Sequence, residues 1–112
     1  MCYDSGAWTN NARMQGAYNS FCHHLERYVS PLPDVFIEEK FDYPYDAGEG
    51  LVQIVASVEI FQGCEWEYSF DECVRYMKVP TDSCDCSGAN RKQGGIASNG
   101  CSKWRMDPNR LR

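Results

Sequence analysis

Helical and strand periodicities alternate along this chain, and they predict an α+β fold of the split β-α-β-β-α-β sandwich type. Such a fold has an antiparallel four-stranded sheet with two helices on one face. Seven cysteines among 112 residues indicate a secreted domain stapled by disulfides. The length suits a single domain that spans residues 1–112.

The first two expected elements are a short strand at residues 2–5 and a helix over residues 10–29. The helix is predicted by one apolar stripe, and Pro31 and Pro33 end it. The residues of the stripe follow one another at 4-3-4-3 spacing: Met14, Tyr18, Phe21, Leu25 and Tyr28.

A hairpin is expected next, because aromatic and β-branched residues fill 35–43 and a Pro- and Gly-containing loop leads into a strand over 51–61. The second strand alternates with period two, which predicts a buried face against the helices. That face carries Val52, Ile54, Ala56, Val58 and Ile60.

The last two expected elements are a helix and a strand. Ser69 to Glu72 fit a capping box, so a helix should run from about 70 to 78 and stop before Pro80. Residues 96–106 are expected to form one final strand that lies beside the first strand. The strand over 35–43 then takes the opposite edge of the sheet. Phe21, Leu25, Val74 and Met77 are expected to pack the helices on the sheet.

Composition excludes several classes of protein. The net charge of −5 and the pI of about 4.9 argue against a nucleic-acid binder. No apolar run approaches the ~20 residues of a membrane span. Residues 1–72 carry a net charge of −10 and residues 73–112 a net charge of +5. This asymmetry indicates either a polarised surface that orients a charged partner or solvated sheet edges.

Two segments near the C-terminus resemble a known family. Residues 84–95 read CDCSGANRKQGG, and residues 101–109 read CSKWRMDPN. This tail, with the cysteine-helix-hairpin-cysteine-helix layout before it, resembles secreted fungal domains of the killer-toxin and necrosis-inducing effector type. Such domains occur alone and beside cell-wall hydrolases. The resemblance implies a secreted, disulfide-bonded α/β domain and carries no agreed chemistry.

The cysteines are expected to form three disulfides and to leave one thiol over. The family tail has one cysteine where this chain has Cys84 and Cys86, so Cys86 is the less certain partner. Cys64 and Cys73 are plausible partners, because nine positions separate a strand end from a helix that folds back. Cys22 should reach across to another element. The six expected to pair are Cys2, Cys22, Cys64, Cys73, Cys84 and Cys101.

Two kinds of functional residue are candidates. A hydrolase would need paired carboxylates, for which Glu39 and Glu59 on neighbouring strands come first and Asp4 next. Loop aromatics with polar neighbours suit stacking on sugar rings, and basic residues follow in the Cys-rich loop. The candidate binding residues are Tyr43, Tyr45, Trp66, Arg91 and Lys92.

No metal or cofactor is expected, because adjacent His23 and His24 on a helix point about 100° apart. The leading interpretation is a secreted effector or killer-toxin-like domain that binds a cell-wall polysaccharide or a host or competitor surface target. One alternative is a small muramidase or chitinase-like glycoside hydrolase. The other is a noncatalytic carbohydrate-binding module.

Overall fold

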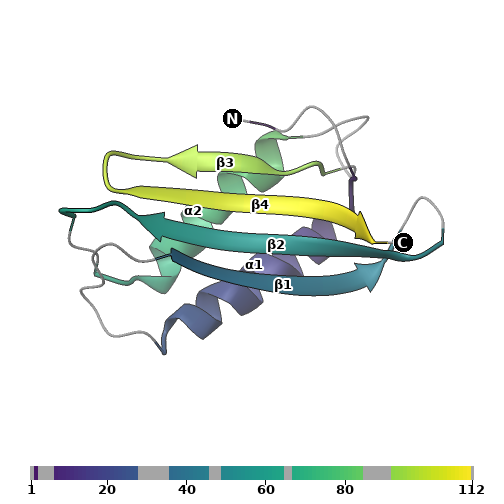
Figure 1. The fold of residues 1–112 in the computed structure, drawn as a ribbon, viewed down its shortest axis with the longest axis horizontal. Coiled ribbons are helices and arrows are strands. Elements are labelled where there is room, and N and C mark those ends of the chain that lie inside the picture. Colours follow the sequence, from purple (N-terminus) through teal and green to yellow (C-terminus); the bar gives the residue numbers. More distant parts are fainter. Residues whose placement is uncertain are drawn as a thin grey trace.

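The computed structural model describes residue 2 and residues 7–27, 36–45, 49–64, 67–84 and 92–111. One antiparallel sheet holds the strands in the spatial order β1-β2-β4-β3, and both helices lie on one face of it (Figure 1). The α+β class, the four-stranded antiparallel sheet and the two helices are therefore confirmed. In chain order the elements are α1 (Asn11–Leu25), β1 (Phe36–Pro44), β2 (Leu51–Ile60), α2 (Phe70–Ser83), β3 (Gly95–Ser98) and β4 (Ser102–Leu111).

The topology differs from the prediction at both ends of the chain. Of the expected first strand, the described residues include only Cys2, which makes an isolated bridge with Gly95. The segment expected as one final strand is two strands, because a turn at Asn99 and Gly100 separates β3 from β4. β4 then pairs along the whole of β2. The acidic hairpin and the basic last strand are therefore neighbours and not opposite edges.

The helices begin where the sequence indicates, but α1 ends earlier, at Leu25, and α2 ends later. The side chain of Asn10 caps α1 by accepting from the Arg13 N–H at 2.9 Å, and Ser69 caps α2. α2 continues through Pro80, so the predicted stop is wrong. Proline has no N–H, so the helical bond to the carbonyl of Tyr76 is lost. Burial of Pro80 and Thr81 offsets that loss.

The core lies between the helices and the inner face of the sheet. All five predicted residues of β2 are buried, at 0–1% exposure. Trp104 and Met106 of β4 extend this face, and the helices cover it from behind (Figure 1). The predicted helix contacts are also confirmed: Phe21, Leu25 and Met77 belong to the core cluster, and Val74 packs against it.

Three disulfides use the six predicted cysteines. Cys22–Cys73 joins α1 to α2, Cys64–Cys101 joins the end of β2 to the β3–β4 turn, and Cys2–Cys84 joins the start of the chain to the end of α2. The predicted Cys64–Cys73 pairing is wrong, because α2 directs Cys73 into the core against α1. Cys86 lies outside the described residues.

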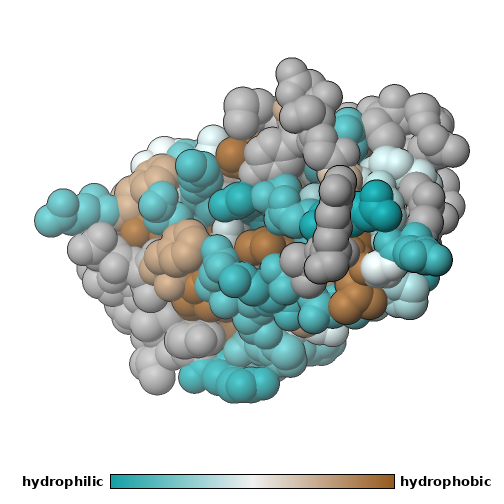
Figure 2. All heavy atoms as spheres, turned by 45° about the vertical axis from the view of Figure 1, so that its right-hand side comes forward, coloured by the Kyte–Doolittle hydropathy of each residue, from teal (hydrophilic) through white to brown (hydrophobic). Residues whose placement is uncertain are grey.

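The outer face of the sheet carries both charged and apolar side chains. Phe36 and Leu51 are among its exposed apolar residues, and the register places them at opposite ends of the sheet. An oblique view of this side shows hydrophilic residues between separate apolar patches (Figure 2). Neither described helix is long and apolar enough to cross a membrane.

Candidate functional site

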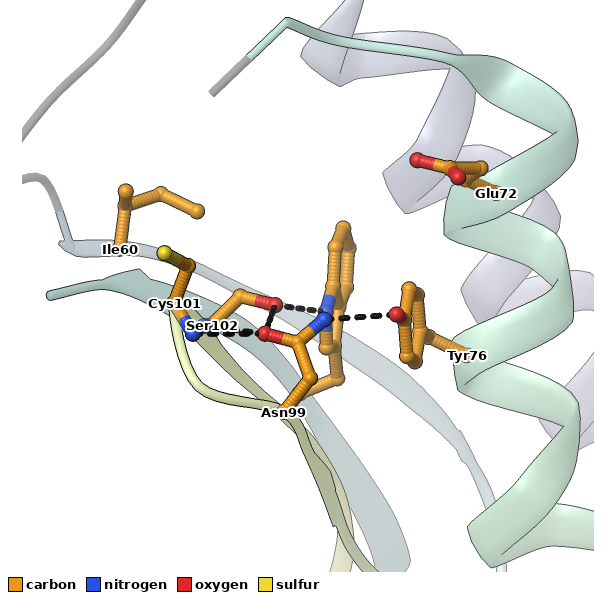
Figure 3. Close-up of a pocket in the computed structure, with 7 residues that line it drawn as sticks. Ile60, Glu72, Tyr76, Asn99, Cys101 and Ser102 are labelled. Atoms are coloured by element: carbon orange, nitrogen blue, oxygen red, sulfur yellow. Dashed lines mark hydrogen bonds between the residues drawn. The ribbon is translucent and has the colours of Figure 1, made fainter. Parts of the chain in front are cut away.

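A small pocket opens between α2 and the end of the sheet where β2 finishes and β4 begins (Figure 3). Its volume is about 170 Å³. Pockets for drug-sized ligands hold roughly 300–1,000 Å³, so this one suits a small chemical group of a larger ligand. We call it the Tyr76 pocket, and its lining consists of Ile60, Glu72, Tyr76, Asn99, Cys101, Ser102 and Trp104.

Two stacked rings form one side of the Tyr76 pocket. Trp104, which is 1% exposed, projects from β4 because its position in the register shares the inner face with Val58. Tyr76 of α2 stacks on it with ring centres 5.4 Å apart and planes 4° apart. The guanidinium of Arg75 lies 4.8 Å from the centre of the Tyr76 ring. These contacts fix the ring and bring the Tyr76 hydroxyl to the pocket (Figure 3).

The turn between β3 and β4 supplies the central amide. The Oδ1 atom of Asn99 accepts from the backbone N–H groups of Cys101 and Ser102, each at 2.8 Å. Because both partners are donors, this oxygen must face the turn and the NH₂ group must face away. The Nδ2 atom of Asn99 accordingly donates to the Tyr76 hydroxyl oxygen at 2.6 Å.

A directed chain of hydrogen bonds follows from this orientation (Figure 3). The indole N–H of Trp104 can only donate, and it donates to Ser102 Oγ at 2.9 Å. Ser102 Oγ donates in turn to Asn99 Oδ1 at 3.1 Å. Asn99 then donates to Tyr76, whose oxygen acts as acceptor. Because the Tyr76 hydroxyl accepts this bond, its own hydrogen remains for donation to another acceptor, and the residue lines the pocket.

One carboxylate stands beside these donors. Glu72 precedes Tyr76 by one turn of α2, so both side chains lie on the same face of the helix. The side chain of Glu72 is 55% exposed and makes a 3.6 Å ion pair with Arg75. Its carboxylate is drawn toward the pocket in Figure 3. The Tyr76 pocket therefore offers hydrogen-bond donors on one side and an anionic acceptor on another.

The predicted catalytic pair is not brought together. Glu39 pairs with Ala56 and lies on the inner face, where its carboxylate contacts His24 Nδ1 at 2.5 Å. Glu59 pairs with Phe36 and lies on the outer face. The two carboxylates are on opposite sides of the sheet, because strand residues alternate between faces. Asp4, the third candidate, lies outside the described residues.

Two of the predicted aromatic residues, Tyr43 and Tyr45, lie at the opposite end of the sheet from the Tyr76 pocket. The ring of Tyr45 is 6.1 Å from that of Trp8 and 4.7 Å from the Arg110 guanidinium. Arg13 lies 6.0 Å from the ring centre of Tyr43 and donates to the carbonyl of Pro44. We call this group the aromatic–arginine cluster, and it consists of Trp8, Arg13, Tyr43, Tyr45 and Arg110.

The remaining predicted binding residues do not join either group. Lys92 is 5% exposed, and its backbone pairs with Thr9 at 2.8 and 3.0 Å. Lys92 is therefore buried, because its backbone is paired with the segment that contains Thr9. Trp66 and Arg91 lie outside the described residues. Within the described ranges, no group of three or more His, Cys, Asp or Glu side chains could hold a metal ion.

The residues of the Tyr76 pocket were not predicted as a site, although part of the signal is local. Asn99-Gly100 is a hairpin dipeptide, and Glu72 and Tyr76 have helical i, i+4 spacing. No family model matches the chain, and a search of the curated proteins finds no significant match. Function is therefore inferred from the chemistry of the pocket.

Proposed function

We propose that this protein is a secreted domain that binds a cell-wall polysaccharide and does not hydrolyse it. The three disulfides support an extracellular location, because such bonds persist in oxidising compartments. The resemblance of the C-terminal tail to killer-toxin and effector domains supports the same location and a binding role.

The arrangement of carboxylates favours binding over hydrolysis. Glycoside hydrolases use two carboxyl groups about 5–10 Å apart across the scissile bond. Glu72 is the one carboxylate in the described lining of the Tyr76 pocket. Glu39 and Glu59 face opposite sides of the sheet and cannot act on one bond.

The directed hydrogen-bond chain is the observation that carries this proposal. Sugar hydroxyl and amide groups both donate and accept, so a site that recognises them needs fixed donors beside an acceptor. Tyr76 and Asn99 supply the donors, and Glu72 supplies the acceptor. Because the rings and the turn are already held by contacts within the protein, little ordering is required when a ligand binds.

A sedimentation assay with insoluble polysaccharides tests the proposal. Chitin, cellulose and purified bacterial walls are incubated with the protein, and wall turbidity is followed in parallel. We expect retention on at least one polymer and no loss of turbidity. Tyr76→Phe should weaken retention, because it keeps the ring and removes only the hydroxyl. Tyr45→Phe makes the same change in the aromatic–arginine cluster, the other candidate binding group, and shows whether a loss of retention is specific to the Tyr76 pocket.

Two results would overturn the proposal. Clearing of the wall suspension by the wild type would show a hydrolase. A wild type that stays in the supernatant with every polymer would show that the protein does not bind cell-wall polysaccharide.

A further inference from the structure

We infer that the Tyr76 pocket accepts the acetamido group of an N-acetylated hexosamine. This inference rests on the proposed polysaccharide binding and deepens it, because it names the sugar substituent that the pocket selects. It follows from three features of the lining: where its donors are, where its acceptor is, and which part of its wall is apolar.

The donors suit a carbonyl oxygen. The Tyr76 hydroxyl receives a hydrogen bond from Asn99, so its own hydrogen is available to a ligand acceptor. Asn99 Nδ2 has a second hydrogen beyond the one that it gives to Tyr76. An amide carbonyl is a strong acceptor with two lone pairs, and it can receive bonds from both groups.

The acceptor suits an amide N–H. Glu72 is more than half exposed, and its 3.6 Å separation from Arg75 is a loose ion pair. Its carboxylate can therefore receive a bond from a ligand N–H. A secondary amide accepts at its C=O and donates at its N–H, and the pocket lining holds both donors and a carboxylate. A hydroxyl group in place of the acetamido group would use only part of this arrangement.

The wall opposite α2 suits a methyl group. It is formed by Ile60 at the end of β2 and by Cys101, which is bonded to Cys64 (Figure 3). These groups offer apolar atoms near the polar ones. A pocket of about 170 Å³ holds an acetamido group while the rest of the sugar chain stays outside. A free amine can pair with Glu72, but it would leave the apolar wall unfilled and would place a cation against two donors.

Isothermal titration of the full chain with three tetrasaccharides tests this inference. The ligands are β-1,4-linked tetramers of N-acetylglucosamine, glucosamine and glucose, which share a backbone and differ in the substituent at carbon 2. We expect the acetylated tetramer to bind at least tenfold more tightly than either of the others. A preference of less than twofold would overturn the inference. Retention on insoluble polymer would continue in that case, so the proposed function would stand.

Two variants test whether the preference for the acetylated ligand arises at the Tyr76 pocket. Asn99→Asp keeps the acceptor that holds the turn and replaces the donor to Tyr76 with a second acceptor. The Tyr76 hydroxyl then donates to the new carboxylate, and we expect the preference for the acetylated ligand to be lost. Asn109→Asp adds the same charge at an exposed position of β4 and should leave the preference unchanged.

Thermal unfolding establishes whether each variant is folded. Tyr76→Phe gives an independent measurement if Asn99→Asp is unstable, because it keeps the bonds from the Cys101 and Ser102 N–H groups to Asn99 Oδ1 and removes only the bond between Asn99 and Tyr76. If both variants fold and both keep the preference for the acetylated ligand, the acetamido site lies elsewhere and the inference is overturned. If Asn99→Asp does not fold, a preference that survives in Tyr76→Phe has the same consequence. If no tetramer and no insoluble polymer binds the wild type, both the inference and the proposed function fail.

Discussion

Removal of the buried Cys22–Cys73 disulfide should destabilise the protein more than removal of Cys64–Cys101. Chain entropy alone accounts for almost none of this difference. The sequence separations of 51 and 37 residues each correspond to about 4 kcal/mol at 25 °C in the loop-closure relation. The difference between the two bridges must therefore come from packing.

Burial supplies that difference. Cys22 and Cys73 are both 0% exposed and belong to the core cluster, whereas Cys101 is exposed and Cys64 is half-buried. Replacing two buried sulfur atoms with the space left by alanine adds about 1–2 kcal/mol. The Cys22→Ala/Cys73→Ala variant should thus lose about 5–6 kcal/mol and the Cys64→Ala/Cys101→Ala variant about 4 kcal/mol. A domain of 112 residues has roughly 6–17 kcal/mol in total.

Urea unfolding of both double variants measures the two losses. Trp104 is buried, so its fluorescence should report the loss of the core. The expected result is the lower midpoint for Cys22→Ala/Cys73→Ala, with equal slopes for the two variants. Equal midpoints, or the reverse order, would refute the burial argument. Non-reducing peptide mapping of the wild type checks the connectivity on which the comparison depends.

Three further changes test the core and two polar contacts. Ile54→Ala should lower the free energy of unfolding by about 2–5 kcal/mol in urea titrations, while Leu51→Ala, at a half-exposed position of the same strand, should cost less than about 1 kcal/mol. Burial and the charge of Glu26 raise the pKa of Tyr68 to about 12. The folded state thus favours the neutral phenol, so this stabilisation is full below pH 10 and is lost as the pH rises toward 12. Thermal melts should show a smaller alkaline loss in Tyr68→Phe. Glu39→Gln should cost under about 1 kcal/mol in the same urea titrations, because the contact with His24 that it weakens is partly exposed.

The parts of the fold that were predictable are those that depend on local pattern. In β2, five alternating positions that face the core all carry aliphatic residues, and the two-residue period of a strand places all five on one face. The cap of α2 is likewise readable from Ser69 and Glu72. In both cases the residues that decide the structure lie within one element, so the sequence contains the whole signal.

The parts that were missed depend on where elements meet. β3 is only four residues long and holds a single large apolar residue, Ile96, so its own pattern is too weak to separate it from β4. The set of bonded cysteines was predictable, but the partner of Cys73 was not. That partner is decided by the contact between α1 and α2, and sequence spacing says nothing about which helix faces which.

The Tyr76 pocket was missed for the same reason, and its position gives the exposed disulfide a second role. Cys101 lies two residues after Asn99, and both the Cys64–Cys101 bond and the 2.9 Å bond from the Phe61 N–H to the Cys101 carbonyl tie this turn to the end of β2. This turn also holds the amide of Asn99 against Tyr76. Loss of this disulfide should therefore loosen the donor at the pocket, whereas Cys22–Cys73 stabilises the core without contributing an atom to the pocket lining. Among folded molecules, the two double variants are thus expected to rank in opposite orders for stability and for ligand binding.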